Sequence, residues 1–142
     1  MTQEQKDLLM KDLCSRLPYG VKGLVTFNGN PFMTQHQIED RTIDGKLYDR
    51  FAAFQESWYD NVTIKPYLFP LSSMTVEQKN SFPFSYSFLE ALIDDGVYFD
   101  EDECITLNDM IYVIQWCYKN HFDIYGLIPM GLAIDATGLN IY

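Results

Sequence analysis

The apolar positions of residues 2–17 recur every three or four residues, the spacing that places side chains on one face of a helix. Thr2 followed by Gln5 matches a capping box, in which the two residues satisfy main-chain N–H groups of the first turn. Pro18 and Gly20 then interrupt the helical ladder. The pattern predicts an N-terminal helix over residues 2–17, with an apolar face formed by Leu9, Met10, Leu13, Cys14 and Leu17.

Between residues 20 and 70 the pattern changes to alternation, which is typical of strands. The pairs Asn28-Gly29 and Asp44-Gly45 suit the positive φ angles of hairpin turns and stand between apolar flanks. Residues 62–68 begin with β-branched side chains, and Pro66 confines the end of that strand to a sheet edge or an extended exit. We therefore expect a small antiparallel β-sheet or partial barrel over residues 20–70.

Residues 75–122 return to helical spacing. Thr75 repeats the capping pattern of the N-terminus, and Ser87 begins a further helix that Gly96 ends. The strongest helical signal starts near Thr106. Its apolar stripe is so wide that it predicts a largely buried helix; the stripe comprises Met110, Ile111, Val113, Ile114, Trp116, Cys117 and Tyr118.

The tail, residues 127–142, contains turn residues and apolar side chains, so we expect an extended or looped segment tied down by its own apolar groups. The 142 residues are 47% hydrophobic and 15% aromatic, a globular composition. Folding a chain of this length buries roughly 68% of its unfolded surface, enough for a core without disulfides or metals. The prediction is a single domain over residues 1–142, of the α+β class, with an N-terminal helix, a small sheet and C-terminal helices.

Charge narrows the range of partners. The chain carries 20 acidic and 10 basic side chains, a formal net charge of −10. Residues 1–71 hold 9 acidic and 8 basic groups, whereas residues 72–142 hold 11 and 2. This excess disfavours nucleic acid and anionic membrane surfaces as partners. No apolar run is long enough to span a bilayer, and the polar N-terminus lacks a secretory signal, so a cytoplasmic location is expected.

The acidic side chains are densest in one short segment, which contains Asp94, Asp95, Asp100, Glu101, Asp102 and Glu103. A calcium loop is a natural hypothesis, but aligning Gly96 with the invariant glycine of such a loop places Ala91 at the first ligand position. No metal site is therefore predicted. The segment fits a solvated acidic loop, or a surface that attracts a basic protein partner.

Nucleophiles and bases are few. Cys14, Cys104 and Cys117 have no C-x-x-C spacing, so reduced thiols are expected rather than disulfides or a zinc site. Cys117 and His121, at i and i+4, form the single nucleophile–base pairing that the pattern offers, and chance produces this spacing on many helices. Phosphate loops, dinucleotide fingerprints and nucleophile elbows are absent from the sequence. We predict no cofactor and assign no catalytic residue.

Three segments occur together in matching order: residues 16–22 (RLPYGVK), 64–75 (IKPYLFPLSSMT) and 126–133 (GLIPMGLA). In these segments the chain resembles a family of small uncharacterised proteins encoded by bacteriophages, prophages and genomes of gut anaerobes of the Bacteroides group. The resemblance implies no activity, because the family has none known. Phe69 stands where an arginine is expected in relatives.

The shared segments are apolar and rich in turns, which suits joints between the N-terminal helix, the β unit and the C-terminal helices. Lys65 and Tyr67, at the end of a strand, are the residues that could form an exposed platform. The absence of catalytic motifs from the sequence, together with the acidic and aromatic-rich composition, favours a non-catalytic protein-interaction module that binds an unidentified protein, and the resemblance implies a phage or mobile-element origin. The alternatives are an acidic nucleic-acid mimic that inhibits a DNA-binding enzyme, and a small enzyme with an unrecognised site.

Overall fold

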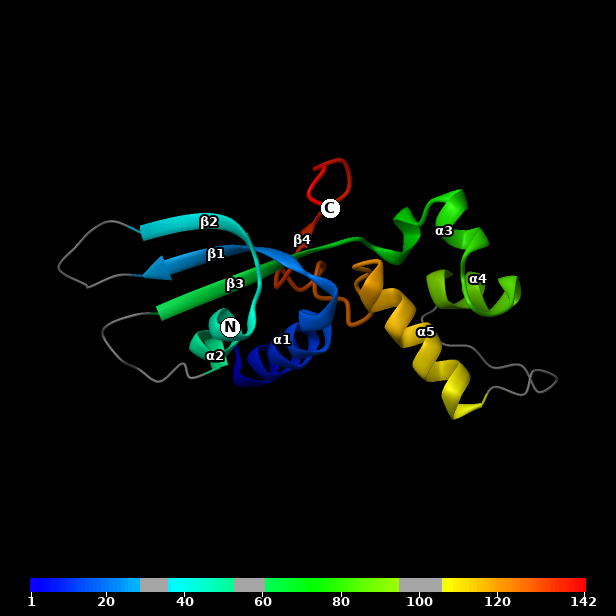
Figure 1. Ribbon diagram of the computed structural model, residues 1–142, viewed down its shortest axis with the longest axis horizontal. Helices are drawn as coiled ribbons and strands as arrows, with labels where there is room; N and C mark the ends of the chain where they lie inside the picture. Colours follow the sequence, from blue (N-terminus) through cyan, green and yellow to red (C-terminus); the bar gives the residue numbers. More distant parts are fainter. Residues whose placement is uncertain (29–35, 53–60, 95–105) are drawn as a thin grey trace.

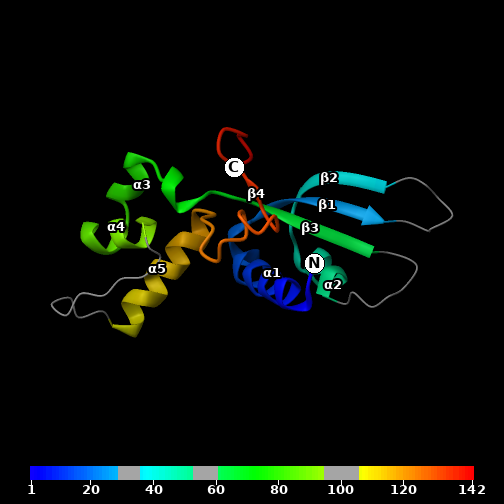
Figure 2. The same ribbon diagram turned by 180° about the vertical axis from the view of Figure 1, so that it is seen from behind.

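The computed structural model describes residues 1–28, 36–52, 61–94 and 106–142 (Figure 1). An N-terminal helix and a four-stranded sheet lie at one end, and the C-terminal helices gather at the other. The view from behind shows the same arrangement, with strand β3 extending toward the helical end (Figure 2). The predicted α+β class is confirmed.

Helix α1 covers Gln3–Arg16, as the periodicity of residues 2–17 predicted. The capping box is present: the Thr2 hydroxyl accepts the Gln5 N–H, and the Gln5 side chain accepts the Thr2 N–H. A short 3₁₀ turn, η1 (Leu17–Tyr19), follows and ends at Gly20, whose φ of +68° suits glycine. The chain then enters the sheet.

The sheet has the strand order β2-β1-β3-β4, with β1 at Lys22–Asn28, β2 at His36–Thr42, β3 at Asn61–Leu68 and β4 at Ile134–Asp135. Strand β1 pairs antiparallel with both β2 and β3, whereas β4 pairs parallel with β3. The three strands within residues 20–70 are antiparallel, as predicted, while β4 from the tail makes the whole sheet mixed, and the sheet is not closed into a barrel. Gly23 lies opposite Pro66, where a Cβ atom would come within 3.0 Å of the Lys65 carbonyl oxygen.

The Asn28-Gly29 turn lies at the edge of the described residues, and the hairpin that it predicted is present, because Asn28 pairs with His36. The Asp44-Gly45 hairpin was wrong. Helix α2 occupies Gly45–Ala52, and the Asp44 carboxylate accepts the Leu47 N–H at 2.9 Å. Asp44 therefore begins a helix, and the helix buries Phe51 one turn beyond Leu47.

The C-terminal helices are α3 (Val76–Asn80), α4 (Tyr86–Asp94) and α5 (Leu107–Lys119), and a 3₁₀ turn, η2 (Leu71–Ser73), precedes them. The capping boxes expected at Thr75 and Thr106 are present. Helix α4 begins earlier than predicted, because the Ser85 hydroxyl, rather than that of Ser87, accepts an N–H of its first turn. The helix stop predicted at Gly96 lies outside the described residues.

Helix α5 is less buried than its apolar stripe predicted. Val113, Cys117 and Tyr118 are buried, but Leu107 is 78% exposed and Ile111 is 43% exposed. The stripe is wide in sequence because the helix has apolar side chains on both its buried and its exposed sides. The pattern identified the helix correctly and overestimated its burial.

Two clusters of buried apolar side chains stabilise the fold. The first joins α1 and α2 to one face of the sheet and includes Leu9, Leu13, Val25, Phe51 and Ile64. The second joins α4 and α5 to the segments on either side of α3 and includes Met74, Phe82, Leu89, Cys117 and Phe122. The prediction of one domain over residues 1–142 stays a prediction.

A small set of polar contacts joins the two clusters. Arg16 of α1 is fully buried, forms a two-point ion pair with Asp12, and donates to the Phe122 carbonyl oxygen at 2.6 Å. Main-chain hydrogen bonds join Phe69 to His121 and Asp123. Two of the three segments that carry the family resemblance, residues 16–22 and 64–75, contribute to this joint through Arg16 and Phe69.

The tail is tied down as predicted, and it also supplies β4. Leu127, Leu132 and Ala136 are buried. Near residue 142, the Tyr142 hydroxyl accepts the Lys22 N–H and donates to the Tyr67 carbonyl oxygen. In the described part of the chain, no helix has the length and apolar character needed to cross a membrane.

Candidate functional site

Strand β3 pairs with β4 over only its last two residues. In the described residues, β4 pairs with Tyr67 and Leu68 of β3 and with nothing before them. The Leu68 carbonyl oxygen accepts the Ala136 N–H at 2.8 Å, so Leu68 directs its main-chain groups toward the β4 side. Alternate residues of a strand direct these groups the same way. Val62, Ile64 and Pro66 therefore direct their main-chain groups toward the β4 side of the strand, and all three residues are buried.

The opposite side of the sheet supports this assignment. The Val21 carbonyl oxygen accepts the Ile43 N–H beside β2, so alternate residues of β1 from Val21 onward face β2. The residues between them, Leu24 and Thr26, face β3 and pair with Lys65 and Thr63. Pairing with β1 thus uses the main-chain groups of Thr63 and Lys65, and those of buried Ile64 point to the other side of β3.

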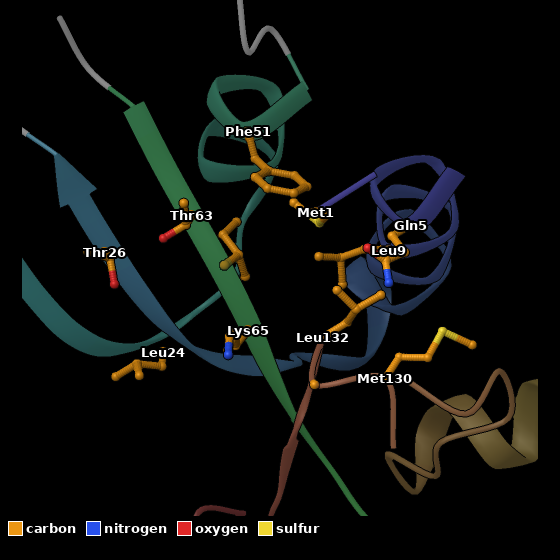
Figure 3. A pocket seen from close by; sticks show the side chains of 12 residues that line it. Met1, Gln5, Leu9, Leu24, Thr26, Phe51, Thr63, Lys65, Met130 and Leu132 are labelled. Atoms are coloured by element: carbon orange, nitrogen blue, oxygen red, sulfur yellow. The ribbon is translucent and has the colours of Figure 1, made fainter. Parts of the chain in front are cut away.

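A groove of about 500 Å³ runs between this side of β3 and α1 (Figure 3). Its floor is apolar and contains Leu9, Phe51, Ile64 and Leu132. A second hollow of about 450 Å³ shares Met1, Phe51 and Thr63 with the first and continues it toward Val62. The groove therefore follows β3 from Lys65 to Val62 and is bordered by polar and flexible side chains: Gln5, Lys6, Thr63, Lys65 and Met130.

Lys65 and Tyr67, the expected platform, have different environments. Lys65 is exposed and lines the groove. Tyr67 is 7% exposed, and its hydroxyl donates to Asp40 Oδ1 at 2.6 Å. That hydrogen bond, with burial and the Asp40 charge, raises the pKa of Tyr67 to about 12. Tyr67 is thus fixed to β2, and Lys65 alone of the pair is placed to contact a partner.

The acidic cluster falls largely outside the description. Asp94 is exposed at the end of α4, whereas Asp95, Asp100, Glu101, Asp102 and Glu103 lie outside the described residues. Among the residues whose positions are described, no three His, Cys, Asp or Glu side chains gather as a metal site would require.

Cys117 and His121 lie one turn apart, but their chemistry does not match a nucleophile–base pair. Burial raises the pKa of the Cys117 thiol to about 12. Burial, together with the charges of Arg16 and Lys22, lowers the pKa of His121 to about 4. The His121 ring instead stacks on Tyr142, with ring centroids 3.6 Å apart. A thiolate–imidazolium pair needs the opposite shifts, a lowered thiol pKa and a protonated histidine.

The lowered pKa of His121 predicts a pH dependence of stability. The unfolded chain protonates His121 near pH 6.5 and the folded chain near pH 4, so the unfolded state binds more protons between these values. Stability is therefore lost as pH falls from 6.5 toward 4. Because the side chain is partly exposed and solvent screens it, we expect a loss of about 1 kcal/mol.

Urea denaturation at pH 7 and pH 5 measures this effect. The matched variant is His121→Asn, because asparagine tolerates the φ of +61° at this position and does not titrate. The carboxylates contribute equally to both proteins, so the difference between them isolates His121. Equal pH sensitivity of the variant and the parent would contradict the prediction.

Comparison with models of known protein families, with curated proteins and with solved structures finds no match for this chain. The functional argument therefore rests on geometry. Sequence patterns predicted Lys65 but missed the other groove residues, such as Gln5, Phe51 and Met130. The usable signal was Pro66, which the pattern placed at a sheet edge; the groove itself depends on where β4 ends.

Proposed function

We propose that the protein is a non-catalytic protein-interaction module and that the groove beside β3 is its docking surface. The observation that carries the proposal is a groove of about 500 Å³ with an apolar floor, bordered by the exposed side chains of Lys65 and Met130. Apolar grooves with a polar rim are typical of surfaces that bind other proteins. The phage or mobile-element origin implied by the resemblance is part of the same proposal.

Charge supports a partner with neutral or acidic character at this surface. Lys6 and Lys65 border the groove, which lies in the half of the chain that is close to neutral. The excess acidity belongs to residues 72–142. A neutral or acidic partner would therefore approach the groove without the electrostatic repulsion that the acidic half of the chain would exert on it.

Site-specific photo-crosslinking tests the proposal. A photoreactive amino acid replaces Gln5 in the groove, and in a second protein it replaces exposed Glu90 of α4. We expect a defined protein to crosslink at position 5 and not at position 90. The identified protein is then purified, and its affinity is measured by titration.

Matched substitutions then locate the binding surface. Met130→Glu places a carboxylate in the groove, and Val76→Glu makes the same kind of change on exposed α3, outside the groove. We expect Met130→Glu to weaken binding at least about tenfold and Val76→Glu to change it by less than about twofold. Equal affinities of the two variants for the purified partner would overturn the groove as the docking surface.

A further inference from the structure

Helix α5 exposes more large apolar side chains than any other helix in the described part of the chain. They are 38% to 78% exposed and comprise Leu107, Met110, Ile111, Tyr112 and Ile114. Every other described helix exposes one such side chain at most. Contiguous exposed apolar side chains mark surfaces that bind other molecules.

Four of these side chains lie in one row. They share the i, i+3, i+4 and i+7 spacing of one helix face, which we call the exposed α5 face: Leu107, Met110, Ile111 and Ile114. The row continues to Tyr118, which is buried and whose ring contacts the Arg16 guanidinium. The exposed α5 face thus begins where the buried part of the row ends. In both views the first turns of α5, drawn in yellow, lie away from α1 and the sheet (Figure 1, Figure 2).

The shape of the exposed α5 face suits another helix. From Leu107 to Ile114 the row extends about 10 Å, at roughly 1.5 Å per residue. A partner helix with an apolar row of its own packs along such a row, with about 8–10 Å between the helix axes. The groove beside β3 has no lining residue from α5, so this face is a second surface.

Charge specifies the kind of helix. Residues 72–142 contain α5 and carry 11 acidic and 2 basic side chains. Helix α5 itself has one acidic residue, Asp109, and one basic residue, Lys119, and neither belongs to the exposed α5 face. In the sequence, the acidic segment ends at Glu103, four residues before Leu107. We infer that the exposed α5 face binds an amphipathic helix of another protein whose polar positions carry lysine or arginine.

A second copy of the chain fits this face less well. Each copy carries a formal net charge of −10, so two copies repel one another. Pairing two α5 helices would bring together the two acidic halves, and Lys119 would be the single basic residue that each helix supplies. A basic helix from another protein replaces this repulsion with attraction.

Three synthetic peptides of about 20 residues, long enough to form a helix, test the inference with the whole chain. The first has leucine at helical spacing along one face and lysine at the polar positions. The second has glutamate in place of every lysine, and the third has the composition of the first in an order that places its leucines on no common face. Fluorescence anisotropy measures binding, and we expect the second and third peptides to bind at least about tenfold more weakly than the first. Added salt should weaken the first peptide.

Two substitutions locate the bound surface. Leu107→Gln and Ile111→Gln each remove an exposed apolar side chain without changing the net charge, and glutamine is a good helix former. Val76→Gln is the matched control, at an apolar residue of α3 that is 73% exposed. We expect each α5 variant to weaken the lysine peptide at least about fivefold, and Val76→Gln to change its affinity by less than about twofold.

Several results would overturn the inference. They are no binding of the lysine peptide, equal binding of the lysine and glutamate peptides, or equal affinities of Ile111→Gln and Val76→Gln. Met130→Gln should leave the affinity for the lysine peptide unchanged, because Met130 borders the groove. If Met130→Gln weakens the peptide and Ile111→Gln does not, the peptide binds in the groove and the exposed α5 face is not its site.

Three further measurements identify a different occupant. A dimer in sedimentation that Ile111→Gln dissociates would assign the exposed α5 face to a second copy. Phosphatidylcholine vesicles that bind the parent and not Ile111→Gln would assign it to a membrane. If Ile111→Gln unfolds at a markedly lower urea concentration than Val76→Gln, the chain itself covers the face.

Discussion

Replacing Asp12 with alanine should lower the free energy of unfolding by about 3–5 kcal/mol, because it leaves a buried guanidinium without its counter-charge. Arg16 is fully buried, and Asp12 meets it through two hydrogen bonds, at 2.7 Å to Nε and 2.8 Å to Nη2. Among the described residues, the Arg16 Nη1 atom has no hydrogen-bond partner. Without Asp12, Arg16 would keep its contact with the Tyr118 ring and its hydrogen bond to the Phe122 carbonyl oxygen.

Urea denaturation measures the loss, and two further proteins show its origin. Asp7→Ala removes an exposed carboxylate from the same helix and should cost less than about 0.5 kcal/mol. The double variant Asp12→Leu with Arg16→Met removes both charges and should be more stable than Asp12→Ala alone. If Asp12→Ala unfolds within about 1 kcal/mol of the parent, the pair does not carry the role assigned to it.

Replacing Phe122 with alanine should also cost about 3–5 kcal/mol, through the lost burial and the cavity left behind. The side chain is 0% exposed, stacks on Trp116 at 5.6 Å between ring centroids, and meets Phe69 edge to face at 6.5 Å. Its main-chain groups accept from Arg16 and donate to the Cys117 carbonyl oxygen, and alanine retains both. The substitution therefore tests the ring alone.

Thermal and urea denaturation report this loss, with Tyr112→Ala as the matched control. Tyr112 is an aromatic residue of α5 that is 65% exposed, so its replacement should change stability by less than about 0.5 kcal/mol. A Phe122→Ala protein as stable as Tyr112→Ala would show that the aromatic contacts at the joint contribute little.

Local signals predicted the elements that depend on local chemistry. The Thr2 and Thr75 capping boxes marked helix starts correctly, because a capping side chain bonds to groups three residues away. The Asp44-Gly45 pair failed because aspartate favours both turns and helix starts. The deciding signal there was the spacing of Leu47 and Phe51, four residues apart and both buried on α2.

Features that depend on contacts between residues far apart in the chain could not be predicted from the sequence. Strand β4 pairs with β3 across a separation of 67 residues, and its two residues carry no pattern of their own. The apolar stripe of α5 could not show that Ile111 and Ile114 are exposed, because periodicity measures the composition of a face and not its surroundings. The groove beside β3 is another feature of this kind. The sequence pattern identified Lys65 as a candidate contact residue, but the environment of Lys65 depends on where β4 ends and how α1 packs.

The joint also sets the order of events during synthesis. Arg16 bonds to Phe122, 106 residues later, and Lys22 bonds to Tyr142, 120 residues later. The ribosome synthesises α1, with Asp12 and Arg16, long before these partners exist. The nascent chain therefore contains a charged pair that is not yet buried. Contacts of such long range slow folding. The N-terminal helix and the sheet thus reach their final environment only after translation has passed residue 142.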